Sequence, residues 1–206
     1  MEKGLAIITG ADGGMGQVIT VALAKEGYPV IMACLNPEKA ASLCNRIQQE
    51  TGNTQIEVRE INLASLSSVN NFTGQLLKEG RPVSRLINNA GILTTPVRKT
   101  EDGLETIVSV NYVAPYMLTR QLLPLMQPGC RIVNTVSCTY AIGRIEPGFF
   151  EKGRNGRFFR IPVYSNTKLA LLLFTQELAE RLQNQGITIN ASDPGIVSTN
   201  MITMQA

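Results

Sequence analysis

Short apolar runs alternate with longer segments of helical period along the chain. The runs span four to six residues and are rich in β-branched side chains, which is typical of buried strands. In the longer segments, apolar residues recur three or four positions apart, which is typical of amphipathic helices. The pattern predicts strands at Leu5–Thr9, Val30–Cys34, Ile56–Ile61, Arg85–Asn88, Arg131–Val136 and Ile187–Ala191. It predicts helices at Gly16–Glu26, Glu38–Glu50, Leu66–Lys78, Leu104–Met126 and Tyr164–Gln185.

This alternation predicts an α/β fold, because each connection between parallel strands needs a crossover of about helix length. We expect a Rossmann-type, doubly wound parallel sheet of about six strands with helices on both faces. A chain of 206 residues lies within the size range of one domain. The prediction is therefore a single domain over residues 1–206.

The segment 138–163 interrupts the alternation of strands and helices. Glycines and prolines are scattered through it among four phenylalanines. We expect a long, partly structured loop here. Long loops in compact domains often act as lids or binding loops, and disorder is the alternative explanation. We favour a lid.

Charge, cysteine and histidine content narrow the function classes. The formal net charge is +3 and the basic residues form no run, so we expect no nucleic-acid partner. The longest apolar run, Leu169–Phe174, is too short to cross a bilayer and no apolar leader precedes Leu5, so we expect no membrane span. The four cysteines form no Cys-x-x-Cys pair, which favours reduced thiols and a cytoplasmic location. The absence of histidine excludes a Ser-His-Asp triad and histidine-ligated zinc, so we expect no metal.

A glycine-rich segment joins the first predicted strand to the first helix. Residues 9–16 read Thr-Gly-Ala-Asp-Gly-Gly-Met-Gly. The glycines permit a tight turn and close approach of a diphosphate, and the helix N-terminus offers free N–H groups. The spacing differs from the commoner G-x-G-x-x-G, so an ordinary strand-to-helix turn is the alternative. We predict dinucleotide binding by Thr9, Gly10, Asp12, Gly13, Gly14, Met15 and Gly16.

The residues after the second predicted strand normally indicate which dinucleotide is bound. An acidic residue there accepts hydrogen bonds from the adenosine ribose, and a basic one pairs with a 2′-phosphate. This chain has Leu35 and Asn36, which are neither. Because this position has no carboxylate to repel a phosphate, and Asn36 and Lys39 could approach one, we slightly prefer NADP over NAD.

Four polar residues are candidates for catalysis. Tyr164 and Lys168 lie at i and i+4 on one predicted helix face, where a nearby ammonium lowers the pKa of a tyrosine from about 10. Such a pair is also common on exposed helices. Ser137 follows the fifth predicted strand, at the edge where parallel sheets bind ligands, and its hydroxyl could polarise a carbonyl. Asn111 falls inside a predicted helix, where asparagine lies on the polar face or has a specific role.

Taken together, these residues resemble the short-chain dehydrogenase/reductase family. The match runs through residues 9–16, the Asn-Asn-Ala-Gly of residues 88–91, Asn111, Ser137, Tyr164 with Lys168, and the Asp-Pro-Gly of residues 193–195 followed by Thr199. Two features are most similar to the retinol-dehydrogenase-like branch: the long interval between Ser137 and Tyr164, and the sequence Leu-Phe-Thr-Gln-Glu-Leu-Ala at residues 173–179.

The resemblance implies hydride transfer between a nicotinamide dinucleotide and a small-molecule carbonyl or alcohol substrate. Tyr164 would exchange the proton, while Lys168 would lower its pKa and hold the nicotinamide ribose. Ser137 would steady the substrate oxygen, and Asn111 would hold a water. The cofactor contacts implied are Leu35, Asn36, Asn62, Leu63, Asn89, Ala90, Gly91, Tyr164, Lys168, Pro194, Gly195, Ile196 and Thr199.

The chain also departs from the family pattern. Leu35 stands where related NADP enzymes carry arginine, and Asn62 stands where the family usually has aspartate. The sequence stops at Ala206, before the segment that usually covers the substrate, so we expect a shortened member or a truncated chain. An open pocket favours the alternative of a dinucleotide-binding protein with little turnover. A structural or regulatory dimer module is a third possibility.

Two predicted helices carry more apolar surface than one packing face needs. The apolar residues of Leu104–Met126 and Tyr164–Gln185 cover more than one side of each helix. Complete burial within one subunit is one explanation. The family resemblance implies that these helices pair across a twofold axis. We expect a homodimer or homotetramer.

Overall fold

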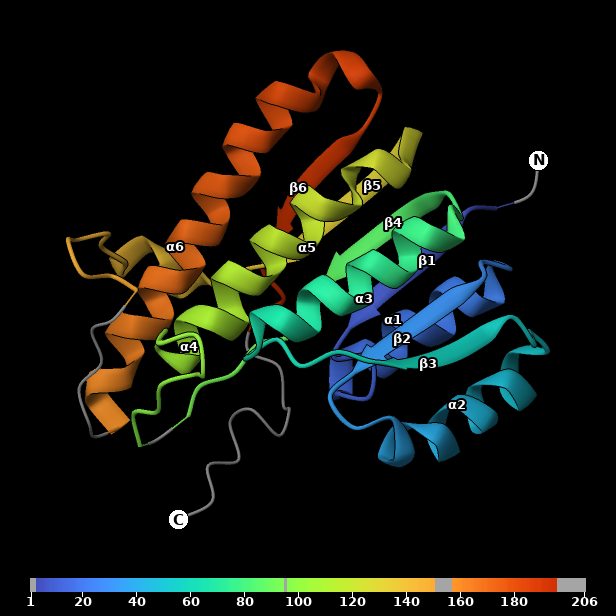
Figure 1. The fold of residues 1–206 in the computed structure, drawn as a ribbon, viewed down its shortest axis with the longest axis horizontal. Helices are drawn as coiled ribbons and strands as arrows, with labels where there is room; N and C mark the ends of the chain where they lie inside the picture. The colour runs from blue at the N-terminus through green and yellow to red at the C-terminus, as the bar shows by residue number, and fades with distance from the viewer. Residues whose placement is uncertain (1–2, 95, 151–156, 196–206) are drawn as a thin grey trace.

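The computed structural model describes residues 3–94, 96–150 and 157–195, with the side chains of 157–159 excepted. Six strands form one parallel sheet in the order β3-β2-β1-β4-β5-β6 (Figure 1). Their bounds are β1 Leu5–Thr9, β2 Val30–Cys34, β3 Ile56–Glu60, β4 Val83–Asn88, β5 Met126–Thr135 and β6 Thr188–Ser192. The predicted α/β fold with a six-stranded parallel sheet is confirmed.

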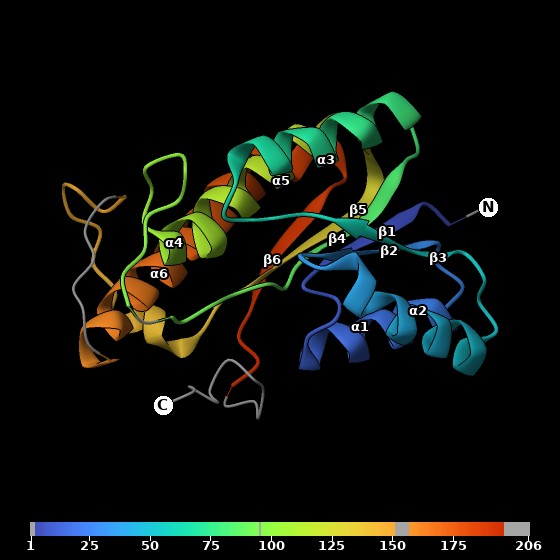
Figure 2. The same cartoon turned by 60° about the horizontal axis from the view of Figure 1, so that its bottom comes forward.

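Helices cover both faces of this sheet (Figure 2). One face carries α1 (Gly14–Lys25) and α2 (Pro37–Thr51), and the other carries α3 (Leu66–Glu79), α5 (Ala114–Leu122) and α6 (Arg157–Leu182). Shorter pieces are α4 (Thr106–Val108), a π-helix at Ser109–Val113, and 3-10 turns at Leu123–Leu125, Cys138–Ile142 and Gln183–Gln185. None of the helices in the described ranges combines the length and apolarity needed to cross a bilayer.

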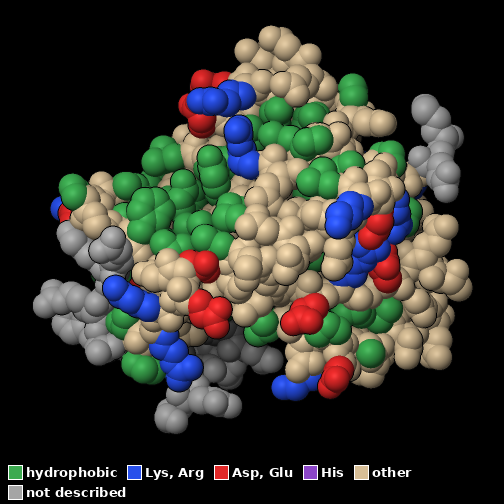
Figure 3. All heavy atoms as spheres, in the orientation of Figure 1, with side chains coloured by type: hydrophobic (Ala, Val, Ile, Leu, Met, Phe, Trp, Pro, Cys, Tyr) green, Lys and Arg blue, Asp and Glu red, His purple; other side chains and the backbone are tan. Residues whose placement is uncertain are grey.

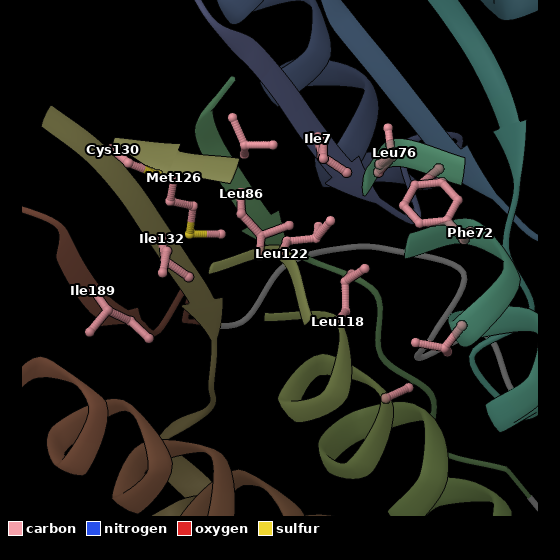
Figure 4. Packing of buried hydrophobic residues seen from close by; sticks show 14 of the residues in the cluster. Ile7, Phe72, Leu76, Leu86, Leu118, Leu122, Met126, Cys130, Ile132 and Ile189 are labelled. Atoms are coloured by element: carbon pink, nitrogen blue, oxygen red, sulfur yellow. The ribbon is translucent and has the colours of Figure 1, made fainter. Parts of the chain in front are cut away.

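The central strands are buried on both faces, as parallel sheets require. Along β1, Leu5 and Ile7 face the layer of α3, α5 and α6, while Ala6 and Ile8 face α1 and α2. Figure 4 shows the larger of the two cores, in which Ile7 and Leu86 of the sheet pack near Leu118 and Leu122 of α5 and Phe72 of α3. This packing holds the carboxyl ends of the strands in fixed positions.

Two predicted boundaries were wrong. The predicted loop over 138–163 is shorter, because the described residues form a 3-10 turn at Cys138–Ile142 and α6 already begins at Arg157; residues 151–156 lie outside the description. Pro162 lies inside α6, in its second turn. Proline lacks the N–H that the helix interior uses, so the sequence placed the helix start after it.

The predicted helix Leu104–Met126 is also not continuous. It consists of α4, the π-helix and α5, and the chain turns into β5 at Met126. The described loop before α4 ends at Glu105, whose carboxylate accepts from the Val108 N–H and caps the helix. The π-helix contains Asn111, which gives this residue its place in the site.

Candidate active site

The candidate site lies at the carboxyl ends of the strands. The strand order reverses between β1 and β4, and in open parallel sheets ligands bind in the crevice at such a point. The glycine loop follows β1, the segment 89–94 follows β4, Ser137 follows β5 and Asp193 follows β6. These four segments, which are distant in the sequence, therefore meet at one edge of the sheet (Figure 1).

The glycine loop has the geometry that a diphosphate requires. Gly10 has a φ of +61°, and a Cβ there would lie 3.2 Å from the Ala90 Cα. A Cβ on Gly16 would lie 2.1 Å from the Gly10 carbonyl oxygen, so only glycine fits. Gly13 is the N-cap of α1 and supplies no side-chain cap, and the first turn of α1 contains no acidic residue. The N-terminus of α1 is therefore suited to bind an anion.

Hydrogen bonds of Thr9 and Asn89 hold the glycine loop against the loop after β4. The Thr9 hydroxyl accepts from the backbone N–H groups of Asn89 and Ala90, both at 3.1 Å. The Asn89 amide donates to the carbonyls of Thr9 and Gly10 at 3.0 and 3.1 Å. Its Oδ1 is buried and finds no hydrogen-bond partner among the described residues. A donor on a ligand at this edge would satisfy that oxygen, so these residues fit a dinucleotide.

Tyr164, Ser137 and Lys168 come together at the end of β5. The Ser137 hydroxyl lies close enough to the Tyr164 oxygen to lower the pKa of that tyrosine. The Lys168 Nζ lies 5.3 Å from the centroid of the Tyr164 ring and donates to the Thr135 carbonyl at 2.8 Å. Lys168 is 2% exposed, so its ammonium is held almost entirely within the protein. The predicted grouping of these three side chains is what the structure shows.

Burial dominates the electrostatics of this group. Burial raises the pKa of Tyr164, and the Ser137 hydrogen bond opposes that rise while Asp193 and Cys138 add to it. Burial lowers the pKa of Lys168 to about 8, and the Asp193 carboxylate opposes this fall. Burial is the largest influence on the Tyr164 pKa, so the expected lowering by Lys168 stays a prediction. Tyr164 therefore keeps its proton at neutral pH.

The Asn111 side chain forms hydrogen bonds that connect separate segments of the site. It is 1% exposed in the π-helix, and its Oδ1 accepts from the Ile92 N–H at 2.8 Å while its Nδ2 donates to the Ile92 carbonyl at 2.9 Å. The same Nδ2 lies 3.5 Å from the Thr167 hydroxyl on α6. Single π-helical turns often occur at functional sites. The side chain joins the loop after β4 to α6, and its expected role of holding a water stays a prediction.

The residues expected on the adenosine side are less closely assembled. Leu35 is 65% exposed, and Asn36 caps α2 by accepting from the backbone N–H of the residue three positions on. The Asn62 Oδ1 accepts from the Ala64 N–H at 2.9 Å. The Leu63 side chain is buried in the core, and its carbonyl accepts from the Ser109 hydroxyl at 3.0 Å. Asn36, Asn62 and Leu63 therefore already make contacts within the protein's own loops and core.

The segment after β6 is described only in part. The Gly195 N–H donates to the Asp193 carboxylate at 2.9 Å, and Gly195 has a φ of +69°. Pro194 is exposed beside it. The predicted cofactor contacts Ile196 and Thr199 lie outside the described residues.

Some residues of the site were missed by sequence reasoning. Asp193 influences the pKa of both Tyr164 and Lys168, and its position directly after the last strand was a usable signal. Thr135 acts through its backbone carbonyl, which no side-chain pattern could reveal. The Thr167 hydroxyl, which donates to the Tyr164 carbonyl at 2.6 Å, lies within the apolar helix pattern.

A buried ion pair anchors the first turns of α6. Arg160, one turn before Tyr164 on α6, pairs with Glu105, and these side chains are 1% and 0% exposed. The Arg160 Nε also donates to the Thr94 carbonyl at 2.8 Å. This pair therefore joins α6 to α4 and to the loop after β4. A buried charge needs such a partner, and losing either member leaves the other uncompensated.

Comparison with known proteins gives consistent results. The chain matches the short chain dehydrogenase family over residues 4–149 and 151–205. It is 36% identical over 198 residues to retinol dehydrogenase 13 of Homo sapiens and 37% identical over 213 residues to retinol dehydrogenase 14 of Mus musculus. These matches cover 95% and 98% of this chain but 59% and 63% of the two relatives, so the chain spans less than two thirds of their length.

Solved structures show the same similarity. A crystal structure of an uncharacterised protein from Mycobacterium paratuberculosis has a TM-score of 0.81 and 36% identity, covering 98% of this chain and 72% of the other. A short-chain dehydrogenase from Sphingobium yanoikuyae, solved in complex with NADPH, has a TM-score of 0.77 at 23% identity, covering 96% of this chain and 73% of the other. The second similarity is one of fold.

Proposed function

We propose that this chain, which belongs to the short-chain dehydrogenase family, interconverts a small-molecule carbonyl compound and its alcohol. A nicotinamide dinucleotide, when bound, supplies the hydride for reduction or accepts it in oxidation. The observation that carries the proposal is the contact of Ser137 with Tyr164 above a buried Lys168. This arrangement provides a proton donor at the crevice edge.

The protein's own residues would handle the proton. Because the pKa of Tyr164 is raised, its phenol carries a proton at neutral pH and can give it to the oxygen of a reacting carbonyl. Ser137, whose hydroxyl lies beside the Tyr164 oxygen, would donate to the same substrate oxygen. A protonated Lys168 stabilises the phenolate that remains. In the direction of alcohol oxidation, that phenolate takes the proton back.

The fit of the cofactor rests on the other end of the crevice. The uncapped N-terminus of α1 would hold the diphosphate, with Gly10 and Gly16 allowing close approach. The buried, unpaired Oδ1 of Asn89 would accept from a donor on the adenosine side. Lys168 would reach the nicotinamide ribose from beneath Tyr164.

The direct test is steady-state absorbance at the reduced-nicotinamide band. A panel of aldehydes, ketones and alcohols, with retinol included because of the relatives' names, would be assayed with each dinucleotide. We expect at least one compound to give turnover above a blank without protein. Calorimetry on the same preparation would measure dinucleotide binding. Binding without turnover on the whole panel would contradict the proposal and favour the binding-protein alternative.

We also propose that the chain forms a homodimer or homotetramer through α5 and α6. Figure 3 shows apolar side chains gathered over these helices, around a hollow of about 490 Å³. Its lining includes Tyr116, Phe150 and Leu173, which are 40%, 47% and 49% exposed. Light scattering at micromolar concentration should give a multiple of 22.4 kDa, and a monomer would contradict it. Leu173→Arg should dissociate the assembly, whereas Val18→Arg on α1 should not.

The proposed location is the cytoplasm. All four cysteines are free, with Cys34, Cys44 and Cys130 buried and Cys138 exposed. Free thiols are typical of proteins in reducing compartments. Fractionation of cells that express the chain would test this, and recovery in a membrane or secreted fraction would contradict it.

A further inference from the structure

An exposed carboxylate lies where the glycine loop meets the second strand. The Gly10 N–H donates to the carbonyl of Ala33 at 2.9 Å, which fixes the loop against the carboxyl end of β2. Two residues further on, Asp12 is exposed, and its carboxylate lies beside the thiol of Cys34, the last residue of β2, so that it raises the pKa of that thiol. Cys34 is fully buried, so Asp12 forms the surface at this point.

The neighbouring residues do not supply a net positive charge for this position. Leu35 is aliphatic and 65% exposed. Glu60, the register partner of Cys34 on β3, is exposed at the adjacent strand end. The first turn of α2 carries Glu38 as well as Lys39, so its charges offset each other. A phosphate at the end of β2 would therefore meet a net negative surface.

This finding bears on the preference for NADP. That preference depended on the absence of a carboxylate after the second strand, together with Asn36 and Lys39, which could approach a phosphate. The structure supplies one from a different segment, because the glycine loop folds against the same strand end. The acidic residue that binds ribose hydroxyls usually follows β2 directly. Here the carboxylate comes from the loop after β1.

We propose that Asp12 accepts hydrogen bonds from the adenosine ribose hydroxyls and thereby makes the site selective for NAD over NADP. The proposal rests on the dinucleotide binding put forward above. A carboxylate accepts from two neighbouring hydroxyls, whereas the 2′-phosphate of NADP removes one donor and adds negative charge. Hydrogen bonds to charged groups of this kind correspond to roughly 10- to 100-fold in affinity.

Calorimetric titration of the full chain with NAD⁺ and NADP⁺ tests this without any substrate. The wild-type protein should bind NAD⁺ at least about tenfold more tightly than NADP⁺. Asp12→Asn should reduce that ratio by about tenfold or more, with the melting temperature showing that the fold is kept. Glu38→Gln is the matched control, since it removes one negative charge from the first turn of α2, and its ratio should stay within about twofold of wild type.

The outcomes separate this proposal from the proposed function. Equal or tighter binding of NADP⁺ by the wild type overturns the role of Asp12 and leaves the oxidoreductase proposal intact. An unchanged ratio in Asp12→Asn does the same, and so does an equal loss in Glu38→Gln, which would assign the effect to general charge. Failure of the folded wild type to bind either dinucleotide overturns both proposals.

Discussion

The two ends of the crevice are built differently. At the catalytic end, Lys168 and Asn111 are almost completely buried, and each is hydrogen-bonded to the backbone of another element. At the nucleotide end, Asp12 and Leu35 are exposed on loops. Chemistry needs atoms fixed to a fraction of an ångström, whereas recognition by exposed side chains can change without a cost to the fold. Departures from the family pattern accordingly gather at the nucleotide end.

The comparison predicts that the largest single effect is at Tyr164. Replacing it by Phe removes only the oxygen that exchanges the proton, so kcat should fall by about 10²- to 10⁴-fold. Circular dichroism and calorimetric binding of the dinucleotide should stay near wild type. Tyr140→Phe, at a tyrosine 36% exposed on the turn after Ser137, is the control and should keep its activity. More than about a tenth of wild-type kcat in Tyr164→Phe would refute the assignment of the proton to this residue.

The second-largest effect is expected at the buried ion pair of Arg160 and Glu105, as a loss in the free energy of unfolding. Arg160→Met leaves the Glu105 carboxylate buried without a partner, so urea unfolding should show a loss of about 3–5 kcal/mol. Arg181→Met breaks an ion pair whose side chains are 64% and 58% exposed, and should cost less than about 1 kcal/mol. Adding Glu105→Gln to Arg160→Met should recover part of the loss. Equal effects of the two arginine substitutions would show that burial does not distinguish the pairs.

Lys168 should show that the catalytic end is built at a cost to stability. Its pKa is lowered to about 8 in the folded protein, so below that pH both folded and unfolded states are charged and the full burial penalty applies. Lys168→Met should therefore raise the free energy of unfolding at pH 7 by about 3 kcal/mol, while abolishing turnover. As pH rises from about 8 towards 10, the wild type sheds its proton and the difference should shrink.

The control for that experiment is Lys25→Met, at a lysine whose side chain is 56% exposed. The free energy of unfolding of Lys25→Met should differ little from that of the wild type, and the difference should be nearly constant from pH 7 to 10. A stability difference for Lys168→Met that does not change over this range would contradict the lowered pKa.

The smallest effect is expected at the nucleotide end. Leu35→Arg places a guanidinium at the exposed end of β2, where it can form a bidentate pair with a 2′-phosphate. The ratio of kcat/KM for NADP to that for NAD should rise by about tenfold. Leu77→Arg, at a leucine 40% exposed on α3, controls for added charge and should leave the ratio unchanged. A constant ratio in Leu35→Arg would show that residue 35 does not face the ribose.

Most of the fold could be predicted because its signals are local. Every residue of the run Leu5–Thr9 is buried, and four of the five are apolar. The start of α2 is marked by Asn36, whose side chain caps the helix, and by Pro37, whose ring fixes a helical φ at the first position. The helix start at Arg157 could not be predicted, since Pro162 is a local stop signal that tertiary packing overrides. The π-helix at Ser109–Val113 likewise has no periodic signature.

The site was predictable where a side chain that carries the chemistry stands in a local pattern. Ser137 directly follows β5, Tyr164 lies four residues before Lys168 on α6, and the two side chains lie together. The Asp12 carboxylate stood in a recognised segment, but only the folded loop shows that it lies beside Cys34. Arg160 and Glu105 are 55 residues apart, and nothing local connects them. Local sequence patterns do not show which residues pair when they are far apart in the chain.

Transfer of deuterium tests the central claim of an oxidoreductase most directly. The protein would be given a reduced nicotinamide dinucleotide deuterated at the transferring position of its ring, together with an aldehyde from the active panel, in ordinary water. Mass spectrometry should find one deuterium on the carbon of the product alcohol, because hydride moves directly between the two carbons while the oxygen takes its proton through Tyr164. An alcohol without deuterium, or no alcohol in a preparation that binds the dinucleotide, would contradict the account.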